Sequence, residues 1–299
     1  MSRIDQSYLV GLIGSGIGAS LTPPMHEEAG DSLGIRYLYR PLDIDSLGPH
    51  RRRLAAQDCG RVLQQGLDLG YNAFNVTHPC KELIMDKLDH LSIAAQEIGA
   101  VNTVVLRGGQ TYGYNTDWSG FSWALTQTFS SEVKNLSPVL QLGSGGAGSA
   151  TAYALLKLGV ELLYLYDLDG AKAGSRANKL GQLFPQQQVL ALDPQDLAKV
   201  AGQVKGLVNA SPCGMHQHPG IPFDLKLLQA GSWVTDIIYL PEQTELINQA
   251  RQLGLSTLTG GLMAVGQAAQ AFELITGQKP DLAAMQEHFK QLLEAQNGQ

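Results

Sequence analysis

The chain has 299 residues, of which 44% are hydrophobic and 16% are charged, and its formal net charge at pH 7 is −6. This length allows two domains of ordinary size, and the composition is that of a globular protein with a sizeable core. The acidic charge argues against nucleic acid or an anionic membrane surface as a partner. Neither a signal peptide nor an apolar run of the ~18 residues that a membrane span needs is found. We therefore expect a cytoplasmic protein without membrane contact.

The three cysteines, Cys59, Cys80 and Cys213, are scattered and show no C-x-x-C spacing. An odd, scattered set of this kind fits a reducing compartment and does not form a zinc site. We therefore expect no metal.

The first part of the chain, up to about residue 117, alternates between strand and helix patterns. Apolar runs predict strands at Tyr8–Ile13, Arg36–Ile44, Asn72–Val76, Val101–Leu106 and Thr111–Tyr114. Helical patterns lie between them, at Pro23–Leu33, in a segment ending near Gly70, at Lys81–Leu88 and at Ser92–Ile98. Strands that alternate with helices predict a mainly parallel α/β sheet.

A connecting helix at Trp118–Phe129 leads to the most informative stretch of the chain. There a strand (Val139–Leu142) meets a glycine-rich turn, an Ala/Leu-rich helix, a second strand (Leu162–Tyr166) and Asp167. This is the order of the dinucleotide-binding βαβ fingerprint. The turn consists of Gly143, Ser144, Gly145, Gly146, Ala147 and Gly148. A purely structural βα turn and a Rossmann-type methyltransferase are the alternatives.

Each glycine of the fingerprint has a physical task. Gly143 permits the tight turn, Gly145 lets the backbone approach a pyrophosphate, and Gly148 lets the helix pack on the strand. The helix N-terminus offers unpaired N–H groups and a positive dipole to an anion. Asp167 can accept hydrogen bonds from ribose hydroxyls but would repel the 2′-phosphate of NADP, and Leu168 and Asp169 supply no cation. The pattern predicts NAD in preference to NADP.

After Asp167 the alternation continues to the end of the chain. A helix at Ala171–Leu183 is followed by strands at Gln188–Leu192, Gly206–Asn209, Ser232–Ile237 and Leu255–Leu258, then by helices at Leu262–Thr276 and Asp281–Glu294. We expect these last helices to return to the first domain and create a hinged cleft. The predicted domains are residues 1–117 with 260–299 for the substrate and 118–259 for the cofactor.

Several polar residues occur where strands of such a fold end. Ser20 and Thr22 place two hydroxyls near a helix start, which suits a carboxylate ligand, although Thr22 is also a plausible N-cap. Lys81, at the start of a predicted helix, is badly placed for the helix dipole, and that placement disfavours the ammonium form, as a general base requires. A solvated surface lysine is the alternative. Asp117 is either an N-cap or the partner that orients Lys81.

Other polar residues also belong to possible sites. Asn75 lies at the carboxyl end of a predicted strand, Lys81 follows where the chain runs into a helix, and Asn102 lies in the next motif. The segment that begins at Asn209 follows a strand of the cofactor domain, where a loop would face the nicotinamide. Gln267, on a helix among Ala and Gly, needs partners for its amide, which a polyhydroxy ligand would provide.

Taken together, these segments resemble the shikimate/quinate dehydrogenase family over nearly the whole chain. The matching motifs, in order, are SLTPPMH, NVTHPCK, GAVNTV, YNTD, GSGGAG, NASPCGM, DIIYLP with Thr244, and GGLMAVGQAAQAF. The resemblance implies a two-domain α/β fold, with an N-terminal substrate domain, a Rossmann domain and C-terminal helices that return to the first domain. It also implies quinate catabolism or the shikimate pathway of aromatic amino acid biosynthesis as the setting.

The resemblance also implies roles for single residues. Lys81 and Asp117 would be the catalytic pair in reversible hydride transfer between nicotinamide and the C3 hydroxyl of quinate or shikimate, whose product is the 3-dehydro ketone. The predicted substrate contacts are Ser20 and Thr22 for the carboxylate, Asn75, Thr77, Asn102 and Gln267 for the hydroxyls, and Tyr239. The predicted cofactor contacts are Gly143, Ser144, Gly145, Gly146, Ala147, Gly148, Asp167, Asn209 and Gly260. A monomer or a homodimer is expected.

Two departures from the commonest family pattern bear on the cofactor. NADP-dependent members usually carry an Asn-Arg-Thr-like run where this chain has Asp167, Leu168 and Asp169, and they tend to have two serines where it has Ser20 and Thr22. Both differences resemble the NAD-linked quinate/shikimate dehydrogenases. They imply NAD, with both acids accepted and their ranking open.

Two other kinds of protein remain as alternatives. One is a related two-domain dehydrogenase of the aminoshikimate or methylenetetrahydrofolate type. The other is a non-catalytic sensor of NAD or a cyclitol acid, for which a proton-transfer pair would have no use.

Overall fold

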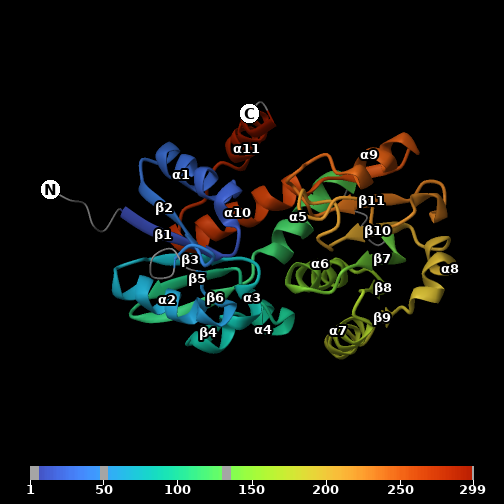
Figure 1. Ribbon diagram of the computed structural model, residues 1–299, viewed down its shortest axis with the longest axis horizontal. Coiled ribbons are helices and arrows are strands. Elements are labelled where there is room, and N and C mark those ends of the chain that lie inside the picture. Colours follow the sequence, from blue (N-terminus) through green and yellow to red (C-terminus); the bar gives the residue numbers. More distant parts are fainter. Residues whose placement is uncertain (1–6, 48–52, 130–135, 298–299) are drawn as a thin grey trace. The chain divides into compact units, whose positions relative to one another are not determined.

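The computed structural model describes residues 7–47, 53–129 and 136–297. The chain divides into two compact units, Met1–Thr116 with Val265–Gln299, and Asp117–Ala264. Each unit contains its own six-stranded sheet (Figure 1). Helix α10 (Gly260–Thr276) begins in the second unit and continues into the first, whereas the sequence-based division had assigned residues 260–299 wholly to the first domain.

The sheet of the first unit has the strand order β2-β1-β3-β5-β6-β4. Its strands are β1 (Ser7–Gly14), β2 (Arg36–Asp43), β3 (Ala73–Val76), β4 (His90–Leu91), β5 (Thr103–Arg107) and β6 (Gln110–Tyr114). Strand β1 is parallel to β2 and β3, but β5 is antiparallel to β3 and β6. The sheet is mixed because β5 and β6 form a hairpin whose turn residues, Gly108 and Gly109, have φ values of 57° and 78°.

The helices of the first unit cover this sheet. They are α1 (Thr22–Ser32), α2 (Cys59–Asp68), α3 (Cys80–Leu83), α4 (Ile93–Ile98), α11 (Leu282–Asn297) and the later part of α10. Helix α2 packs closely on β3, since a methyl group at Gly66 would stand 2.5 Å from the Phe74 ring. Helix α11 packs against α1, near the C-terminus of the chain (Figure 1).

The second unit is a doubly wound α/β domain. Its strands are parallel in the order β12-β11-β10-β7-β8-β9. They are β7 (Val139–Leu142), β8 (Leu162–Tyr166), β9 (Gln188–Ala191), β10 (Gly206–Asn209), β11 (Trp233–Asp236) and β12 (Ser256–Leu258). Every residue of β7, β10 and β11 is buried, as expected for strands covered on both faces.

The helices of this unit begin with α5 (Asp117–Phe129), α6 (Gly146–Lys157) and α7 (Gly170–Leu183), and continue with α8 (Leu197–Ala201) and α9 (Glu245–Gln252). The expected two-domain α/β fold class is confirmed. None of the helices in the described part of the chain is long and apolar enough to cross a membrane.

The helix predicted at Lys81–Leu88 is wrong in its extent. The structure has only the four-residue α3, followed by a 3-10 turn at Met85–Lys87. The Lys81 carbonyl accepts a hydrogen bond from the Val101 N–H at 2.9 Å, a partner from another segment of the chain. This tertiary contact takes an acceptor that a longer helix would have used within itself, and no sequence periodicity reveals it.

A buried aromatic cluster surrounds His26 on α1. The His26 ring is fully buried, lies against Tyr37, Tyr39 and Phe272, and has its Nδ1 3.0 Å from the Tyr37 hydroxyl. Within the described ranges of the chain, its Nε2 has no hydrogen-bond partner. Burial lowers the pKa of His26 from 6.5 to about 3. His26 is therefore a packed residue of the core.

The low pKa of His26 predicts acid sensitivity of the fold. Below pH 6.5 the unfolded chain binds a proton on this ring, whereas the folded chain does so only near pH 3. The free energy of unfolding should therefore fall with pH in this window, by up to about 1.4 kcal/mol per pH unit. In His26→Gln this contribution should vanish. Urea unfolding at about pH 7 and about pH 5 measures it, and an identical pH dependence in the two proteins would refute it.

Candidate functional site

Polar residues of the first unit gather at one edge of its sheet. Strands β1 and β3 end there together, because Ile13 pairs with Val76 in a parallel register. Strand β5 begins at the same edge, since Thr103 pairs with Asn75, and β6 ends there, since Tyr114 also pairs with Thr103. Side chains at these strand ends are therefore close neighbours.

A hydrogen-bond network joins several of these side chains. The Tyr39 hydroxyl donates to Asn75 Oδ1 at 2.7 Å, and Asn75 Nδ2 donates to Thr103 Oγ1 at 3.0 Å and to the Asn102 carbonyl at 3.2 Å. Asn102 Oδ1 accepts from the Thr116 N–H at 2.7 Å and from the Thr103 hydroxyl at 3.1 Å. Both amide hydrogens of Asn75 are thus used inside the network, so Asn75 meets a ligand as an acceptor.

Helix α10 adds Gln267 to this network. Asn102 Nδ2 donates to Thr116 Oγ1 at 2.9 Å and lies 3.5 Å from Gln267 Oε1. The structure therefore brings together three of the predicted substrate contacts: Asn75, Asn102 and Gln267. Sequence reasoning missed Tyr39, whose only signal was a tyrosine at a buried position of a predicted strand.

The two hydroxyls predicted to hold a carboxylate lie at the start of α1. Ser20 follows a 3-10 turn after β1, and its Oγ accepts a hydrogen bond from the Thr22 N–H at 3.3 Å. Thr22 is the first residue of α1, and the N-cap position belongs to Leu21. The alternative interpretation of Thr22 as the N-cap is therefore wrong, and both side chains are half-buried.

The predicted proton-handling residues, Lys81 and Asp117, lie on two different helices. Lys81 is half-buried on α3, whose N-terminus lies beyond Thr77 at the end of β3. A helix of four residues has little macrodipole, so the helix-dipole argument for Lys81 does not apply. Asp117 is the first residue of α5 in the second unit and is 5% exposed.

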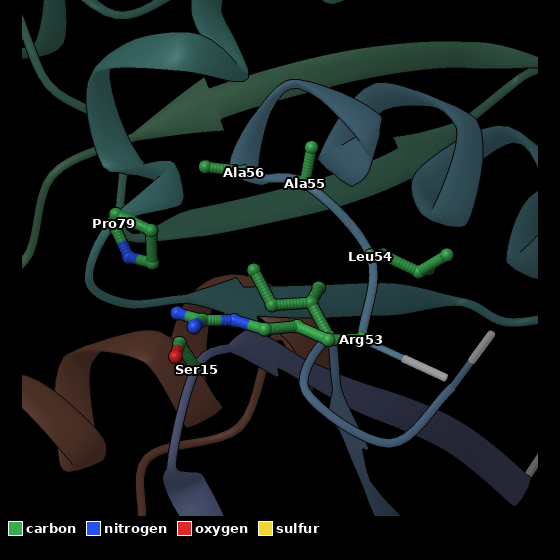
Figure 2. A pocket seen from close by; sticks show the side chains of 7 residues that line it. Ser15, Arg53, Leu54, Ala55, Ala56 and Pro79 are labelled. Carbon is green, nitrogen blue, oxygen red and sulfur yellow. The ribbon is translucent and has the colours of Figure 1, made fainter. Parts of the chain in front are cut away.

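A cavity of about 340 Å³ opens in the first unit near this edge (Figure 2). Its lining comprises Ser15, Ile44, Arg53, Leu54, Ala55, Ala56 and Pro79. Figure 2 shows the Arg53 side chain extending toward Ser15. Asp45 joins these two, since its Oδ2 accepts from Ser15 Oγ at 2.5 Å and its Oδ1 lies 2.6 Å from Arg53 Nε. The Ser15 hydroxyl and then the Arg53 cation lower the pKa of Asp45. The predicted substrate residues do not line this cavity.

The glycine turn of the second unit has the geometry of a dinucleotide cradle. Gly143 has φ 95°, and a Cβ at Gly148 would stand 2.3 Å from the Gly143 carbonyl oxygen, so the fold itself requires both glycines. Gly145 is different, because its φ of −72° suits any residue and a Cβ there would meet only the Lys172 Nζ, 3.6 Å away. A glycine that the fold does not need leaves space for a ligand to approach.

Other features of this turn also fit an anionic cofactor. The first N–H groups of α6 have no side-chain cap, which leaves the N-terminal residues Gly146 and Ala147 open to an anion. The Ser144 hydroxyl is buried and has no hydrogen-bond partner among the residues that the structure describes. The residues present therefore fit a bound dinucleotide phosphate.

Gln141, which sequence reasoning missed, holds the turn in place. From its fully buried position in β7, its Nε2 donates to the carbonyls of Gly143 at 2.9 Å and Gly148 at 2.7 Å. Its Oε1 accepts from Thr151 Oγ1 at 2.9 Å. The available signal was a glutamine within an otherwise apolar strand. Its amide satisfies two carbonyls at the closest approach between strand and helix.

Asp167 lies directly beside the turn. Its Oδ2 accepts from the Ser144 N–H at 2.7 Å, and its Oδ1 accepts from the Asp169 N–H at 3.0 Å. Each oxygen retains acceptor capacity for a ribose hydroxyl. Sequence reasoning considered only Leu168 and Asp169 as sources of a cation here, and it missed Lys172, which brings its Nζ from α7 close to Gly145.

Asn209 and Gly260, the remaining predicted cofactor residues, make contacts within the protein itself. Asn209 Nδ2 donates to the Cys213 carbonyl at 2.9 Å and to Asp236 Oδ1 at 3.1 Å, while its Oδ1 accepts from the N–H and hydroxyl of Ser211. This uses the full capacity of the amide, so Asn209 shapes its loop. A Cβ at Gly260 would stand 2.3 Å from the Ile237 carbonyl oxygen, which explains that glycine by packing.

Comparisons with family models, known sequences and solved structures all point to the same protein family. Residues 12–104 match the shikimate dehydrogenase substrate binding domain, and residues 263–288 match the shikimate 5′-dehydrogenase C-terminal domain. The shikimate dehydrogenase (NADP(+)) of Pseudarthrobacter chlorophenolicus is 49% identical over 99% of each chain. The quinate/shikimate dehydrogenase (NAD(+)) of Corynebacterium glutamicum strain R is 41% identical over 97% of this chain and 100% of the other.

The solved structure of quinate dehydrogenase from Corynebacterium glutamicum in complex with NAD superposes with a TM-score of 0.87 at 42% identity. The match covers 95% of this chain and 99% of that one. With this identity and coverage, the resemblance inferred from the motifs is confirmed: the chain belongs to the shikimate dehydrogenase family.

Proposed function

We propose that this protein is an NAD-dependent dehydrogenase that reversibly oxidises the C3 hydroxyl of quinate, shikimate or both to the 3-dehydro ketone. The observation that carries the proposal is the amide cluster of Asn75, Asn102 and Gln267 at the sheet edge that the chain leaves to form α3, which carries Lys81. Such amides bind hydroxyl groups in fixed directions. A ring with several hydroxyls and one carboxylate matches these groups together with Ser20 and Thr22.

The network also defines how the hydroxyls would be held. Asn75 presents acceptor capacity only, because the Asn102 carbonyl and Thr103 hydroxyl take its two hydrogens. It would therefore accept a hydrogen bond from a ring hydroxyl. Because Tyr39 holds Asn75 from behind, the amide is oriented before substrate binds, which reduces the entropy lost on binding.

Lys81 and Asp117 handle the proton in this proposal. When the C3 hydroxyl is oxidised, Lys81 Nζ accepts its proton, and the carboxylate of Asp117 stabilises the resulting ammonium. The bound dinucleotide supplies the hydride acceptor. Ser20 and Thr22 orient the ring through its carboxylate, so that the reacting hydroxyl is presented to Lys81.

NAD is favoured by the position of Asp167. Its carboxylate is fixed at the glycine turn by the N–H groups of Ser144 and Asp169, where it can bind ribose hydroxyls and would repel a 2′-phosphate. Two observations favour NADP as a second cofactor. Lys172 Nζ lies near the turn, and the Pseudarthrobacter relative is an NADP enzyme.

Replacement of Lys81 tests the proton step. Lys81→Ala should lower kcat by about 10²–10⁴-fold, the usual contribution of a general base, while NAD binding is kept. Lys87→Ala is a matched control, because this exposed lysine pairs only with Asp86 among the contacts described and should keep full turnover. Steady-state rates and a cofactor titration separate the two. Near-normal turnover in Lys81→Ala would remove this residue from the mechanism.

Replacement of Asp167 tests the basis of cofactor choice. Asp167→Ala removes the charge that opposes a 2′-phosphate and should raise kcat/KM with NADP relative to NAD by about tenfold, the equivalent of about 1.4 kcal/mol. The control is Asp169→Ala, because that exposed carboxylate caps α7 instead and should change the ratio little. An unchanged NADP/NAD ratio in Asp167→Ala would contradict the argument.

A further inference from the structure

A buried carboxylate lies at the end of β11 and has no part in the mechanism above. Asp236 is fully buried; its Oδ1 accepts from Asn209 Nδ2 at 3.1 Å and from the Ile238 N–H at 3.0 Å. Its Oδ2 accepts from the Thr244 hydroxyl at 2.9 Å. In the described part of the chain no cationic side chain pairs with it. Its negative charge is held by neutral donors alone.

This charge is costly for the fold. Burial raises the pKa of Asp236 from 3.8 to about 6, although its three hydrogen bonds act in the opposite direction. At neutral pH the group is therefore ionised in an environment that disfavours its charge. Buried charges in proteins are usually paired, and perturbed pKa values cluster at functional sites, so Asp236 is a candidate functional group.

The register of the sheet places Asp236 in the cofactor half of the unit. Leu142 of β7, Asn209 of β10 and Asp236 of β11 are paired in one row at the carboxyl edge. The strand order reverses between β7 and β10, and a dinucleotide lies across such a point with one half on each side. Asp167, which follows β8, marks the adenosine side, so the nicotinamide half belongs over β10 and β11. Asp236 is two strands, about 10 Å, from the glycine turn.

The oxidised nicotinamide ring carries a positive charge, whereas the reduced ring is neutral. We propose that the charge of Asp236 strengthens the binding of the oxidised cofactor relative to that of the reduced cofactor. This inference rests on the proposed function, because it requires a nicotinamide cofactor. A bias of this kind favours capture of the oxidised form and release of the reduced form.

A purely structural role for Asp236 predicts a different result. Its hydrogen bonds join the Asn209 turn to the loop that ends at Thr244, the N-cap of α9. In Asp236→Asn the amide oxygen can still accept from Asn209 and Ile238, and the amide nitrogen can donate to Thr244 Oγ1. This variant therefore removes the charge and keeps the number of hydrogen bonds. If Asp236 has only a structural role, the ratio of the affinities for NAD⁺ and NADH should stay unchanged.

The test is the dissociation constant of NAD⁺, by calorimetry, and of NADH, by fluorescence, at about pH 7.5. Asp236→Asn should raise the Kd of NAD⁺ by about tenfold, because the nicotinamide ring loses the attraction of one buried negative charge, and should leave that of NADH unchanged. Glu245→Gln is the control, because this exposed neighbour is screened by water and should leave the ratio unchanged. Equal changes in both constants, or none, would overturn the proposal.

A pH titration of the two affinities, in the wild type and in Asp236→Asn, provides a second test. As pH falls through about 6, Asp236 takes up its proton, and the preference for NAD⁺ should decline in the wild type but not in Asp236→Asn. Other titratable groups on the adjoining loops and on α9 are shared by both proteins: Cys213, His216, His218, Glu242 and Glu245. A parallel decline in the two proteins would overturn the assignment to Asp236. If neither cofactor form binds the wild type, the proposed function itself fails, and this inference with it.

Discussion

The close approach of the Gly148 backbone to the Gly143 carbonyl is the constraint on which the cofactor half of the molecule depends. At this point a single added carbon would stand 2.3 Å from the Gly143 oxygen, so the helix can meet the strand only through glycine. Gln141 completes the contact by donating to both carbonyls. These hydrogen bonds fix the glycine turn. The turn then positions the N-terminus of α6 and the Asp167 carboxylate.

In the first unit the polar side chains are also fixed in place, but by hydrogen bonds among themselves. Its polar side chains satisfy one another: Tyr39 holds Asn75, and Asn75 and Asn102 share Thr103. Buried polar groups that lack partners are expensive, so a network of this kind holds its amides in place before any ligand arrives. In both units the side chains predicted to contact a ligand are therefore held in place by neighbouring residues, as a precise binding site requires.

The fold class and the family were predictable because their signals are local. The strand–glycine–helix order and the alternating apolar runs can be read from the sequence without knowledge of tertiary contacts. The predictions of the fold class and of the family are both confirmed. Lys172 was not predicted, because only the fold of α7 brings its Nζ to Gly145. The helix at Lys81 was overextended because a distant N–H captures the Lys81 carbonyl. The contacts of all the predicted site residues with substrate or cofactor remain predictions.

The most direct test of the account is the initial rate of reduced-cofactor formation by the purified protein, with NAD or NADP crossed against quinate and shikimate. The account predicts that at least one of the two acids is oxidised with NAD and that NADP gives much slower rates. Oxidation with NADP but not with NAD would contradict the role given to Asp167. No oxidation of either acid with either cofactor by folded protein would contradict the proposed reaction.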